Sequence, residues 1–411
     1  MVRSNQSWII CLSAALFFFY AVFQMSFFNT ICHELLTSFA ITPVQLGVLS
    51  SLYFYSDALF LFPAGILLDK FSTRTLLLSF MALSTISMFL FAHTHSIAIV
   101  ALCRIIWGIG NAFAFLGCLR LVAVWFPPKR NAFVMGLLVT IGMSGGIVAQ
   151  APFSLLVTRT SWQQAVMVFT IIGLIMWLIM YFNLKDKKEN THHPKETLHI
   201  LLKEVFSRKQ SWLCGIYAGC LNLPILVLGA LWGSFYLQQS HHISAVSASF
   251  IVTFLFLGLI IGAPIMGHFS DKILSRRKPM ITGALLALIV VFCIFLTSTT
   301  ASPLLLAALF FLLGFSSSAQ VLSYPAVAES NPDRITATAL SIVAIIINVM
   351  AALMQPLFAL LMKHQITTTN SLIYLNNQHA LLILPLAFFL SLMVAIAIYD
   401  TQCTSKATFE P

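Results

Sequence analysis

Residues 65–74 read GILLDKFSTR, and residues 267–278 read GHFSDKILSRRK. In both stretches a glycine stands four residues before an Asp-Lys pair, and further cations follow. Each stretch comes after the second long apolar segment of its half of the chain. An internal repeat of this size predicts two helical bundles related by symmetry, with a solute path between them near the middle of a membrane.

Both turns are candidates for gates. The glycine would let a neighbouring helix approach closely. The aspartate would accept charge-assisted hydrogen bonds from nearby cations or from a helix N-terminus, and such a cluster can hold one conformation closed. For either turn alone, an ordinary charged loop is the alternative. The expected gating residues are Gly65, Asp69, Lys70, Arg74, Gly267, Asp271, Lys272 and Arg276, together with Glu329, which would close against Arg334 or the second turn, or else be a solvated loop carboxylate.

Composition places most side chains in lipid. Of the 411 residues, 59% are hydrophobic and 8% are charged, whereas about a quarter of the residues in soluble domains are charged. A spanning helix needs about 20 mostly apolar residues. Twelve segments qualify, at roughly 8–31, 44–68, 75–92, 97–119, 132–156, 162–183, 211–237, 244–268, 279–298, 302–325, 335–362 and 380–399. The sequence thus predicts an all-α membrane protein with twelve transmembrane helices in two pseudo-symmetric six-helix bundles.

One long polar segment separates the sixth and seventh apolar segments. It divides the chain into an N-terminal bundle (1–183), a cytoplasmic linker (184–210) and a C-terminal bundle with a short cytoplasmic tail (211–411). Within the linker, Leu198, Leu201, Leu202 and Val205 recur at helical spacing, which is compatible with an amphipathic surface helix. A solvated connection with no other role is the interpretation that we favour.

The distribution of cations predicts the topology. With both termini in the cytoplasm, 19 of the 22 Lys and Arg residues fall on cytoplasmic segments. Arg159 and Lys363 face outward, and Arg104 lies within a span. Because cytoplasmic loops are enriched in cations, this partition supports twelve spans. The net charge of +10 therefore reflects topology and does not indicate binding to nucleic acid.

The two turns resemble the loop signature GxxxD[RK]xGRR of the major facilitator superfamily. The first departs from it at Ser72 and Thr73, and the second is looser after its Asp-Lys pair. The fourth span reads RIIWGIGNA from Arg104 and is similar to the family's RxxxGxG motif. This resemblance implies a secondary transporter that works by alternating access and needs no cofactor.

A narrower resemblance runs through most of the chain. The stretches YFYSDALFLFPAGILLDK, GIGNAFAFLGCLRLVAVWFPPKR, GMSGGIVAQAP and FLLGFSSSAQVLSYPAVAESNP are similar to phagosomal nutrient transporters of intracellular bacteria. That group implies a bacterial inner membrane and proton-coupled import of an amino acid or a nucleoside. Related transporters of such bacteria handle carboxylate siderophores, so transport of a siderophore or another organic anion, in either direction, is the alternative.

Two ionisable residues lie well inside the predicted spans. They are Asp57 in the second span and Arg104 in the fourth. A charge at the bilayer centre costs roughly 2.5–3.5 kcal/mol on insertion scales, so each needs a reason. One reason is a structural ion pair between them. The other is function, in which Asp57 binds a proton or a substrate amine and Arg104 binds a carboxylate or senses protonation nearby. The family resemblance links an arginine of the fourth span to proton coupling or to anionic substrates.

Neutral polar and aromatic side chains within the spans are further candidates, although each alone more often joins helices than lines a cavity. With Asp57 and Arg104, the candidate substrate- or proton-binding residues are Gln24, Tyr53, Trp107, Asn111, Gln150, Asn222, Gln320, Tyr324 and Asn348. Pro152 and Pro224 are expected to kink the fifth and seventh spans.

Other classes of function are less consistent with the sequence. An enzyme needs a convergent catalytic set, and the sequence has no such set, no metal-ligand spacing and no nucleotide-binding loop. A membrane receptor that does not transport is a remoter alternative. We expect a monomer whose partners are a small-molecule substrate, protons and membrane lipid.

Overall fold

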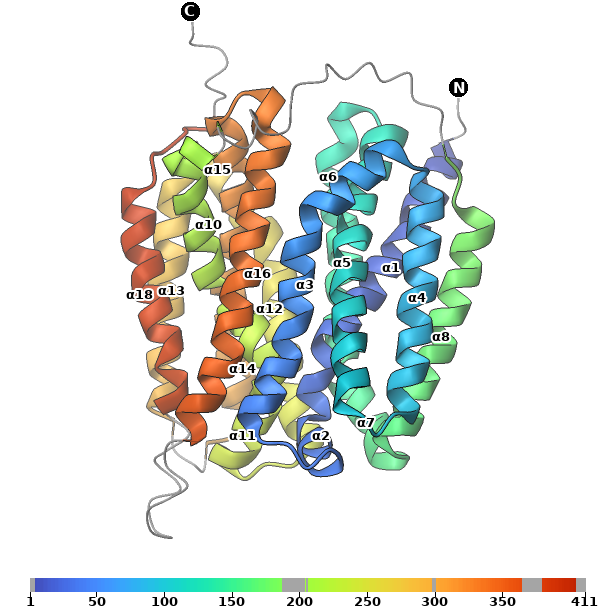
Figure 1. The fold of residues 1–411 in the computed structure, drawn as a ribbon. Helices are drawn as coiled ribbons and strands as arrows, with labels where there is room; N and C mark the ends of the chain where they lie inside the picture. Colours follow the sequence, from blue (N-terminus) through green and yellow to red (C-terminus); the bar gives the residue numbers. More distant parts are fainter. Residues whose placement is uncertain (1–3, 187–203, 205, 298–300, 364–378, 404–411) are drawn as a thin grey trace, which may run out of the picture.

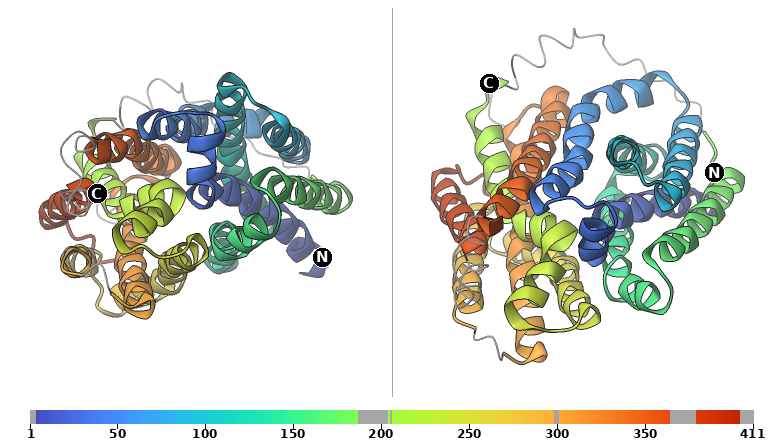
Figure 2. Two further views of the ribbon diagram at one scale, coloured as in Figure 1. Left: turned by 90° about the horizontal axis from the view of Figure 1, so that it is seen from below. Right: turned by 60° about the horizontal axis from the view of Figure 1, so that its bottom comes forward.

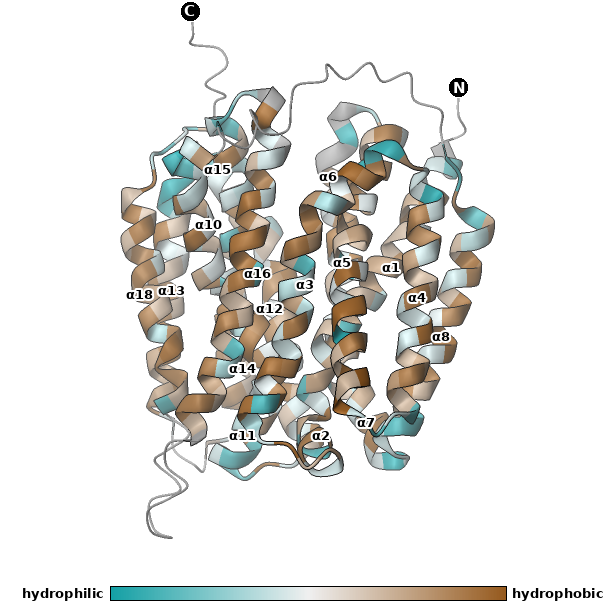
Figure 3. Cartoon of the chain, viewed as in Figure 1, coloured by the Kyte–Doolittle hydropathy of each residue, from teal (hydrophilic) through white to brown (hydrophobic). Residues whose placement is uncertain are grey.

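The computed structural model describes residues 4–186, 204, 206–297, 301–363 and 379–403, and this part of the chain contains helices and no strand. Twelve helices in it are long and apolar enough to cross a membrane. Figure 3 shows apolar residues along them and polar residues gathered toward their ends. The prediction of a twelve-helix membrane protein is confirmed. The amphipathic helix considered at 198–205 falls largely outside the described residues.

The first half of the chain contains six spans, the fifth of which is interrupted. The backbone of Gln150 leaves the helical region (φ −94°, ψ −111°), and Pro152 follows within the first turn of the next helix, which confirms the predicted disturbance. The helices are α1 (Ser4–Thr30), α2 (Cys32–Ser38), α3 (Pro43–Lys70), α4 (Thr73–His93), α5 (Ile97–Trp125), α6 (Pro128–Val148), α7 (Ala151–Arg159) and α8 (Trp162–Asn183).

The second half repeats this order, with two irregular spans. The seventh span changes from α-helix to π-helix at Pro224, where we expected a kink, and the tenth contains one 3₁₀ segment. The helices are α10 (Lys209–Leu221), η1 (Pro224–Trp232), α11 (Gly233–His241), α12 (Ala245–Lys272), α13 (Arg277–Phe295), α14 (Pro303–Ser317), η2 (Ser318–Leu322), α15 (Ser323–Ser330), α16 (Asp333–Lys363) and α18 (Ile383–Ala397).

The two halves form two groups of helices that lie side by side (Figures 1 and 2). The start of α1 and the end of α18 lie at the same end of the molecule, together with Lys70 and Lys272. We call this the basic end, and we call the opposite end, with α2, α7 and α11, the far end. The boundaries proposed at 183/184 and 210/211 stay a prediction.

A matched contact at the basic end shows the symmetry of the halves. Three residues after Asn183, the carboxylate of Asp186 accepts hydrogen bonds from the Ser72 hydroxyl and from the backbone N–H of Arg74 (3.0 Å). Three residues after Ala397, Asp400 accepts hydrogen bonds from the Ser275 hydroxyl (2.5 Å) and from the backbone N–H of Arg276 (3.0 Å). Each carboxylate therefore joins the end of the sixth span of its half to the start of the third.

The halves meet most extensively where α3 runs along α16. Near the far end, Gly47 lies against this neighbour so closely that a Cβ on it would come within 2.9 Å of the Cα of Pro356. Phe256 of α12 fills the corresponding space beside Gly146 of α6. Small residues at these positions let the two halves pack at short range toward the far end.

Candidate functional site

Arg104 is the central charge of the N-terminal bundle and has no exposed surface. One Nη donates to the carbonyl of Gln24 (3.0 Å), and the other donates to the carbonyl and the hydroxyl of Ser50 (2.8 and 2.9 Å). Its Nε has no hydrogen-bond partner among the described residues. The helices α1, α3 and α5 thus hold the guanidinium through neutral oxygens only.

Aromatic rings surround the same guanidinium. Its carbon lies 4.3 Å from the ring centre of Phe28, 5.1 Å from that of Tyr53 and 6.0 Å from that of Trp107. The Tyr53 hydroxyl donates to the carbonyl of Ala21 (3.1 Å), which fixes the ring. The indole N–H of Trp107 is buried, and no described residue accepts a hydrogen bond from it. Ring faces stabilise a cation by cation–π attraction but do not neutralise its charge.

Asp57 lies at a different place, on the side of α3 that meets the C-terminal half. Its Oδ2 accepts a hydrogen bond from Asn111 Nδ2 (2.7 Å), and its Oδ1 accepts none within the part of the chain that the structure describes. Asn348 of α16 lies within reach of the carboxylate, and Tyr324 of α15 is near enough to interact with its charge. Asp57 therefore stands among residues of both halves.

Asp57 and Arg104 do not form the structural ion pair that the sequence allowed. Each group found its own neutral partners on neighbouring helices. Five predicted candidates have side chains beside these charges: Tyr53 and Trp107 around the arginine, and Asn111, Asn348 and Tyr324 around the aspartate. Whether they bind a solute stays a prediction.

The other neutral candidates divide into two groups. Gln24 is bound by its amide to the carbonyl of Ser84 (3.2 Å) and joins helices. Gln150 lies at the far end, where its side chain bonds to Asn29 and to the carbonyl of Gly229. Asn222 and Gln320 each keep a buried side-chain oxygen that makes no hydrogen bond within the described part of the chain, and therefore can accept one from a solute or water.

Sequence reasoning missed several residues of these clusters. Ser50 and Phe28 bind the guanidinium, and Asn29 and Ser234 join the two halves at the far end. Asn29 carried a usable signal, because an amide near the end of an apolar span has to find a partner. Ser50 and Phe28 carried none, since such residues occur throughout the spans.

The charges of the first turn are bound within the N-terminal bundle. Asp69 pairs with Arg120 of α5. Arg74 donates through Nη2 to the carbonyl of Tyr181 (2.9 Å) and lies over its ring. Lys70 is exposed.

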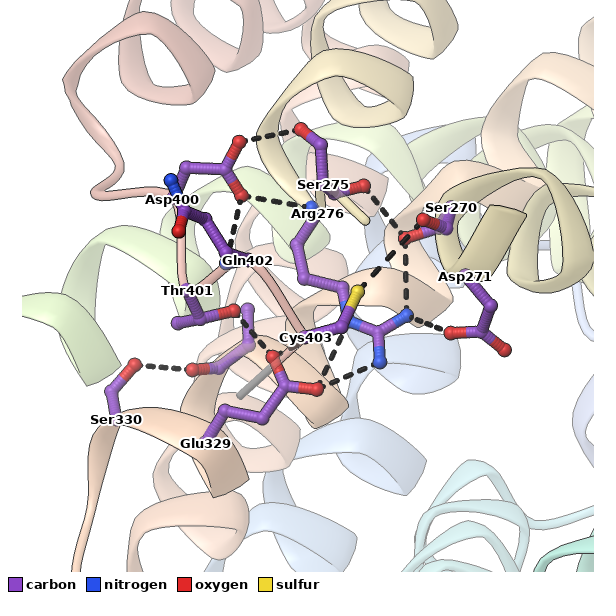
Figure 4. A network of polar contacts seen from close by, with 11 residues as sticks. Ser270, Asp271, Ser275, Arg276, Glu329, Ser330, Asp400, Thr401, Gln402 and Cys403 are labelled. Atoms are coloured by element: carbon purple, nitrogen blue, oxygen red, sulfur yellow. Dashed lines mark hydrogen bonds and ion pairs between the residues drawn. The ribbon is translucent and has the colours of Figure 1, made fainter. Parts of the chain in front are cut away.

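The charges of the second turn form a larger cluster around Arg276, shown in Figure 4. The guanidinium contacts Asp271 (2.6 Å), the Ser270 hydroxyl (3.1 Å) and both oxygens of Glu329. Glu329 also accepts a hydrogen bond from Thr401. Glu329 thus binds the second turn, one of the partners that the sequence offered, and is not a solvated loop carboxylate. Its part in a gate stays a prediction. Lys272 of the same turn is exposed.

The expected role of the two glycines is wrong for this structure. Apart from its chain neighbours and the nearby backbone of its own helix, a Cβ on Gly65 or on Gly267 would meet no described atom within 4 Å. Among the described residues, no neighbouring helix comes close to either glycine in this conformation. The close approach predicted from the sequence therefore requires a conformation other than this one.

Known proteins are similar to the chain at several levels. The family model described as Major Facilitator Superfamily matches residues 12–354 and, in a second match, 225–402. The membrane sensor protein UhpC of Salmonella typhimurium is 24% identical over 297 residues, which are 66% of this chain and 65% of that protein. The D-galactonate transporter of Escherichia coli O6:H1 is 25% identical over 334 residues, 72% and 75% of the two chains. The match with the sensor spans less than two thirds of its length.

A solved structure has the same fold. A bacterial homologue of the human lysosomal transporter Spinster, in an inward-facing and unoccupied conformation, superposes with a TM-score of 0.77 and covers 97% of this chain and 98% of its own. Its sequence identity is 15%, so the likeness concerns the fold alone. With two matched halves of six spans and a family match over most of its length, the chain belongs to the major facilitator superfamily.

Proposed function

We propose that the protein is a secondary transporter that moves a small organic anion across the membrane by alternating access, with Arg104 as the residue that attracts the anion. The observation that carries the proposal is a fully buried guanidinium that forms no ion pair with a described carboxylate. An isolated buried charge is costly, and an anionic ligand that pairs with it recovers part of that cost. Its free Nε–H supplies a donor for such a ligand.

The relatives support an anion as the substrate class. Besides the D-galactonate transporter, they include a hexuronate transporter of Bacillus subtilis, 25% identical over 292 residues, and a probable hexose phosphate transport protein of Chlamydia trachomatis, 23% identical over 296 residues. Each named substrate carries a carboxylate or phosphate. This favours the alternative raised from the sequence, an organic anion, over the amino acid or nucleoside that was the first expectation.

The contacts between the halves support alternating access. Hydrogen bonds between described residues of the two halves lie at the far end. At the basic end, the ion pairs Asp69–Arg120 and Arg276–Glu329 each join two residues of one half. If the basic end is cytoplasmic, as the cations indicate, this is a state closed to the outside. We assign proton coupling to Asp57, which lies between the halves and whose Oδ1 accepts no hydrogen bond from a described residue.

Uptake into proteoliposomes tests the proposal. Labelled D-galactonate, glucuronate and glucose 6-phosphate would be compared with a neutral nucleoside and with an amino acid, with and without an imposed pH gradient. We expect uptake of at least one anion, accelerated when the side facing the substrate is acidic. Uptake of the nucleoside or amino acid alone would overturn the anion, and equal uptake without a gradient would overturn proton coupling.

A receptor is the second candidate, because one relative is named a membrane sensor. A receptor would bind the anion without moving it. Binding measured by thermal shift, combined with no uptake and no exchange of labelled anion across the vesicle membrane, would favour this function over transport.

A further inference from the structure

The far end contains a buried network of amides and hydroxyls that joins the two halves. Its members are Asn29 of α1, Gln150 between α6 and α7, Ser234 of α11 and Ser249 of α12, and none of these side chains is more than 1% exposed. Asn29 Nδ2 lies 2.5 Å from Gln150 Oε1 and 2.8 Å from Ser234 Oγ. Ser234 Oγ lies 3.2 Å from Ser249 Oγ. We call these four residues the far-end seal.

Two bonds of the seal go to the backbone of the seventh span. Asn29 Oδ1 accepts the N–H of Ser234 (2.8 Å), and Gln150 Nε2 donates to the carbonyl of Gly229 (3.0 Å). Both side chains come from the N-terminal half, and both backbone groups belong to the C-terminal half. The contact therefore depends on two side-chain amides of the N-terminal half and on two backbone groups of the seventh span, and not on pairs of side chains alone.

The position of these backbone groups is informative. The π-helix η1 ends at Trp232, and its last bond runs from the N–H of Gly233 to the carbonyl of Leu228, five residues back. The next bond in that series would join the N–H of Ser234 to the carbonyl of Gly229. These are the two groups that Asn29 and Gln150 occupy. The amides of one half thus bind where the π-helix of the other half ends.

We propose that Asn29 and Gln150 hold the far end closed by satisfying this N–H and this carbonyl, and that the two groups bond to each other when the far end opens. A buried backbone group without a hydrogen-bond partner costs free energy. Breaking the bonds from Asn29 and Gln150 would therefore be costly if it left the N–H of Ser234 and the carbonyl of Gly229 unpaired. Here the released N–H and carbonyl are already one i to i+5 pair. Opening would lengthen the π-helix by one bond and leave neither group orphaned.

The effect of the seal on transport rests on the proposed function, since the seal would set how often the transporter opens to the far side. The seal itself does not. It concerns the position of the two halves and can be measured without substrate. A failed uptake assay would leave it intact, and an unchanged far end in seal variants would leave the transport assignment intact.

Spin-label distances at the far end test the seal. His33 of α2 and Gln239 of α11 are exposed, lie on opposite halves and are not part of the seal, so H33C and Q239C provide the labelling sites once Cys293 and Cys403 are replaced by serine. Double electron–electron resonance then reports the populations of closed and open far ends in purified protein.

Asn29→Ala and Gln150→Ala are expected to raise the ratio of long to short distances about tenfold each, as the loss of a buried hydrogen bond or two would. Ser234→Ala removes the hydroxyl but keeps the backbone N–H, so it should shift the ratio less than Asn29→Ala. The matched control is Gln355→Ala, because Gln355 is as buried and also bonds the seventh span, at the carbonyl of Leu226 (2.7 Å), but from its own half. It should leave the distances unchanged.

Hydrogen exchange of residues 229–237 gives a second measurement and serves if one variant does not fold. In Gln150→Ala, Asn29 still accepts the Ser234 N–H, so this amide should exchange more slowly than in Asn29→Ala. Unchanged distances in both amide variants would overturn the proposal. So would a shift in Ser234→Ala or Gln355→Ala as large as that in Asn29→Ala.

Discussion

Arg276 and Glu329 are joined by two guanidinium nitrogens, with Nη2 2.7 Å and Nε 3.1 Å from the same carboxylate oxygen. Their side chains are only 10% and 15% exposed, which distinguishes them from surface pairs. Burial alone would lower the pKa of Arg276, but its hydrogen bonds and charge interactions with Glu329 and Asp271 raise that pKa above the ordinary value. The pair ties the end of α15 to the start of α13.

Glu329→Ala is therefore expected to destabilise the protein by about 2 kcal/mol, because it leaves a largely buried guanidinium with one carboxylate fewer. Thermal unfolding of the purified protein in detergent measures this. The control is Glu34→Ala, since Glu34 of α2 forms no ion pair with any described residue. An equal melting temperature for the two variants would show that the pair adds no stability.

The lowered pKa of Asp400 predicts that the stability of the protein depends on pH in the acidic range. Burial would raise its pKa, but hydrogen bonds from the Ser275 hydroxyl and from the backbone N–H groups of Arg276, Gln402 and Arg277 outweigh it and lower the pKa below its ordinary value. A carboxyl whose pKa falls on folding stabilises the folded state above its unfolded pKa, about 3.9, and loses that contribution as the pH falls through the folded value.

Asp400→Asn should remove this contribution. The melting temperature of the variant should lie below that of the wild type at neutral pH, and the gap should narrow as the pH is lowered below about 4. Melting curves between neutral and acidic pH measure the gap. A gap that is constant with pH would mean that Asp400 acts through packing and not through its charge.

The spans followed from hydropathy, because a segment such as Trp162–Asn183 has no other environment available to it than lipid or a helical interior. The repeated turns could also be predicted from the sequence, since an Asp-Lys pair follows the second span of each half. The matched carboxylates Asp186 and Asp400 were missed, because each is a single residue in a different polar context and only its partners reveal it.

The site was less accessible to sequence reasoning. The free-energy cost of a charge inside the bilayer was enough to single out Arg104 and Asp57. Their neighbours, however, depend on how α1, α3, α5 and α16 cross. The π-helix at Pro224 was also only partly visible, because proline predicts a kink but not the five-residue hydrogen-bond spacing that follows.

Arg104→Ala is expected to reduce anion uptake at low substrate concentration at least tenfold, because a hydrogen bond to a charged group contributes roughly 1.5–3 kcal/mol. Arg104→Lys should recover only part of it, since an ammonium lacks the planar fork that reaches Gln24 and Ser50 together. The folded yield of both variants should match that of Arg159→Ala, an exposed arginine at the far end. Wild-type uptake by Arg104→Ala would remove this residue from the site.

Asp57→Asn is expected to abolish the acceleration of uptake by a pH gradient while substrate exchange across the membrane continues. The amide can still accept the hydrogen bond from Asn111 but cannot gain and lose a proton. Asn111→Ala keeps the acid and should keep the gradient dependence. Both are measured by uptake with and without the gradient, compared with exchange at equal pH, and gradient-driven uptake by Asp57→Asn would assign coupling elsewhere.

Gly65 and Gly267 are expected to tolerate a large side chain in this conformation and not in the opposite one. Gly65→Leu and Gly267→Leu should therefore fold with wild-type yield, because a Cβ meets nothing within 4 Å at either position. If the turns close on the other half during transport, each variant should lose most of its uptake, and the far-end distances should shift toward the closed state. Gly136→Leu is the matched control, since Gly136 of α6 is equally open but lies outside the repeated turns. Full uptake by both turn variants would mean that no helix approaches these glycines at any stage of the cycle.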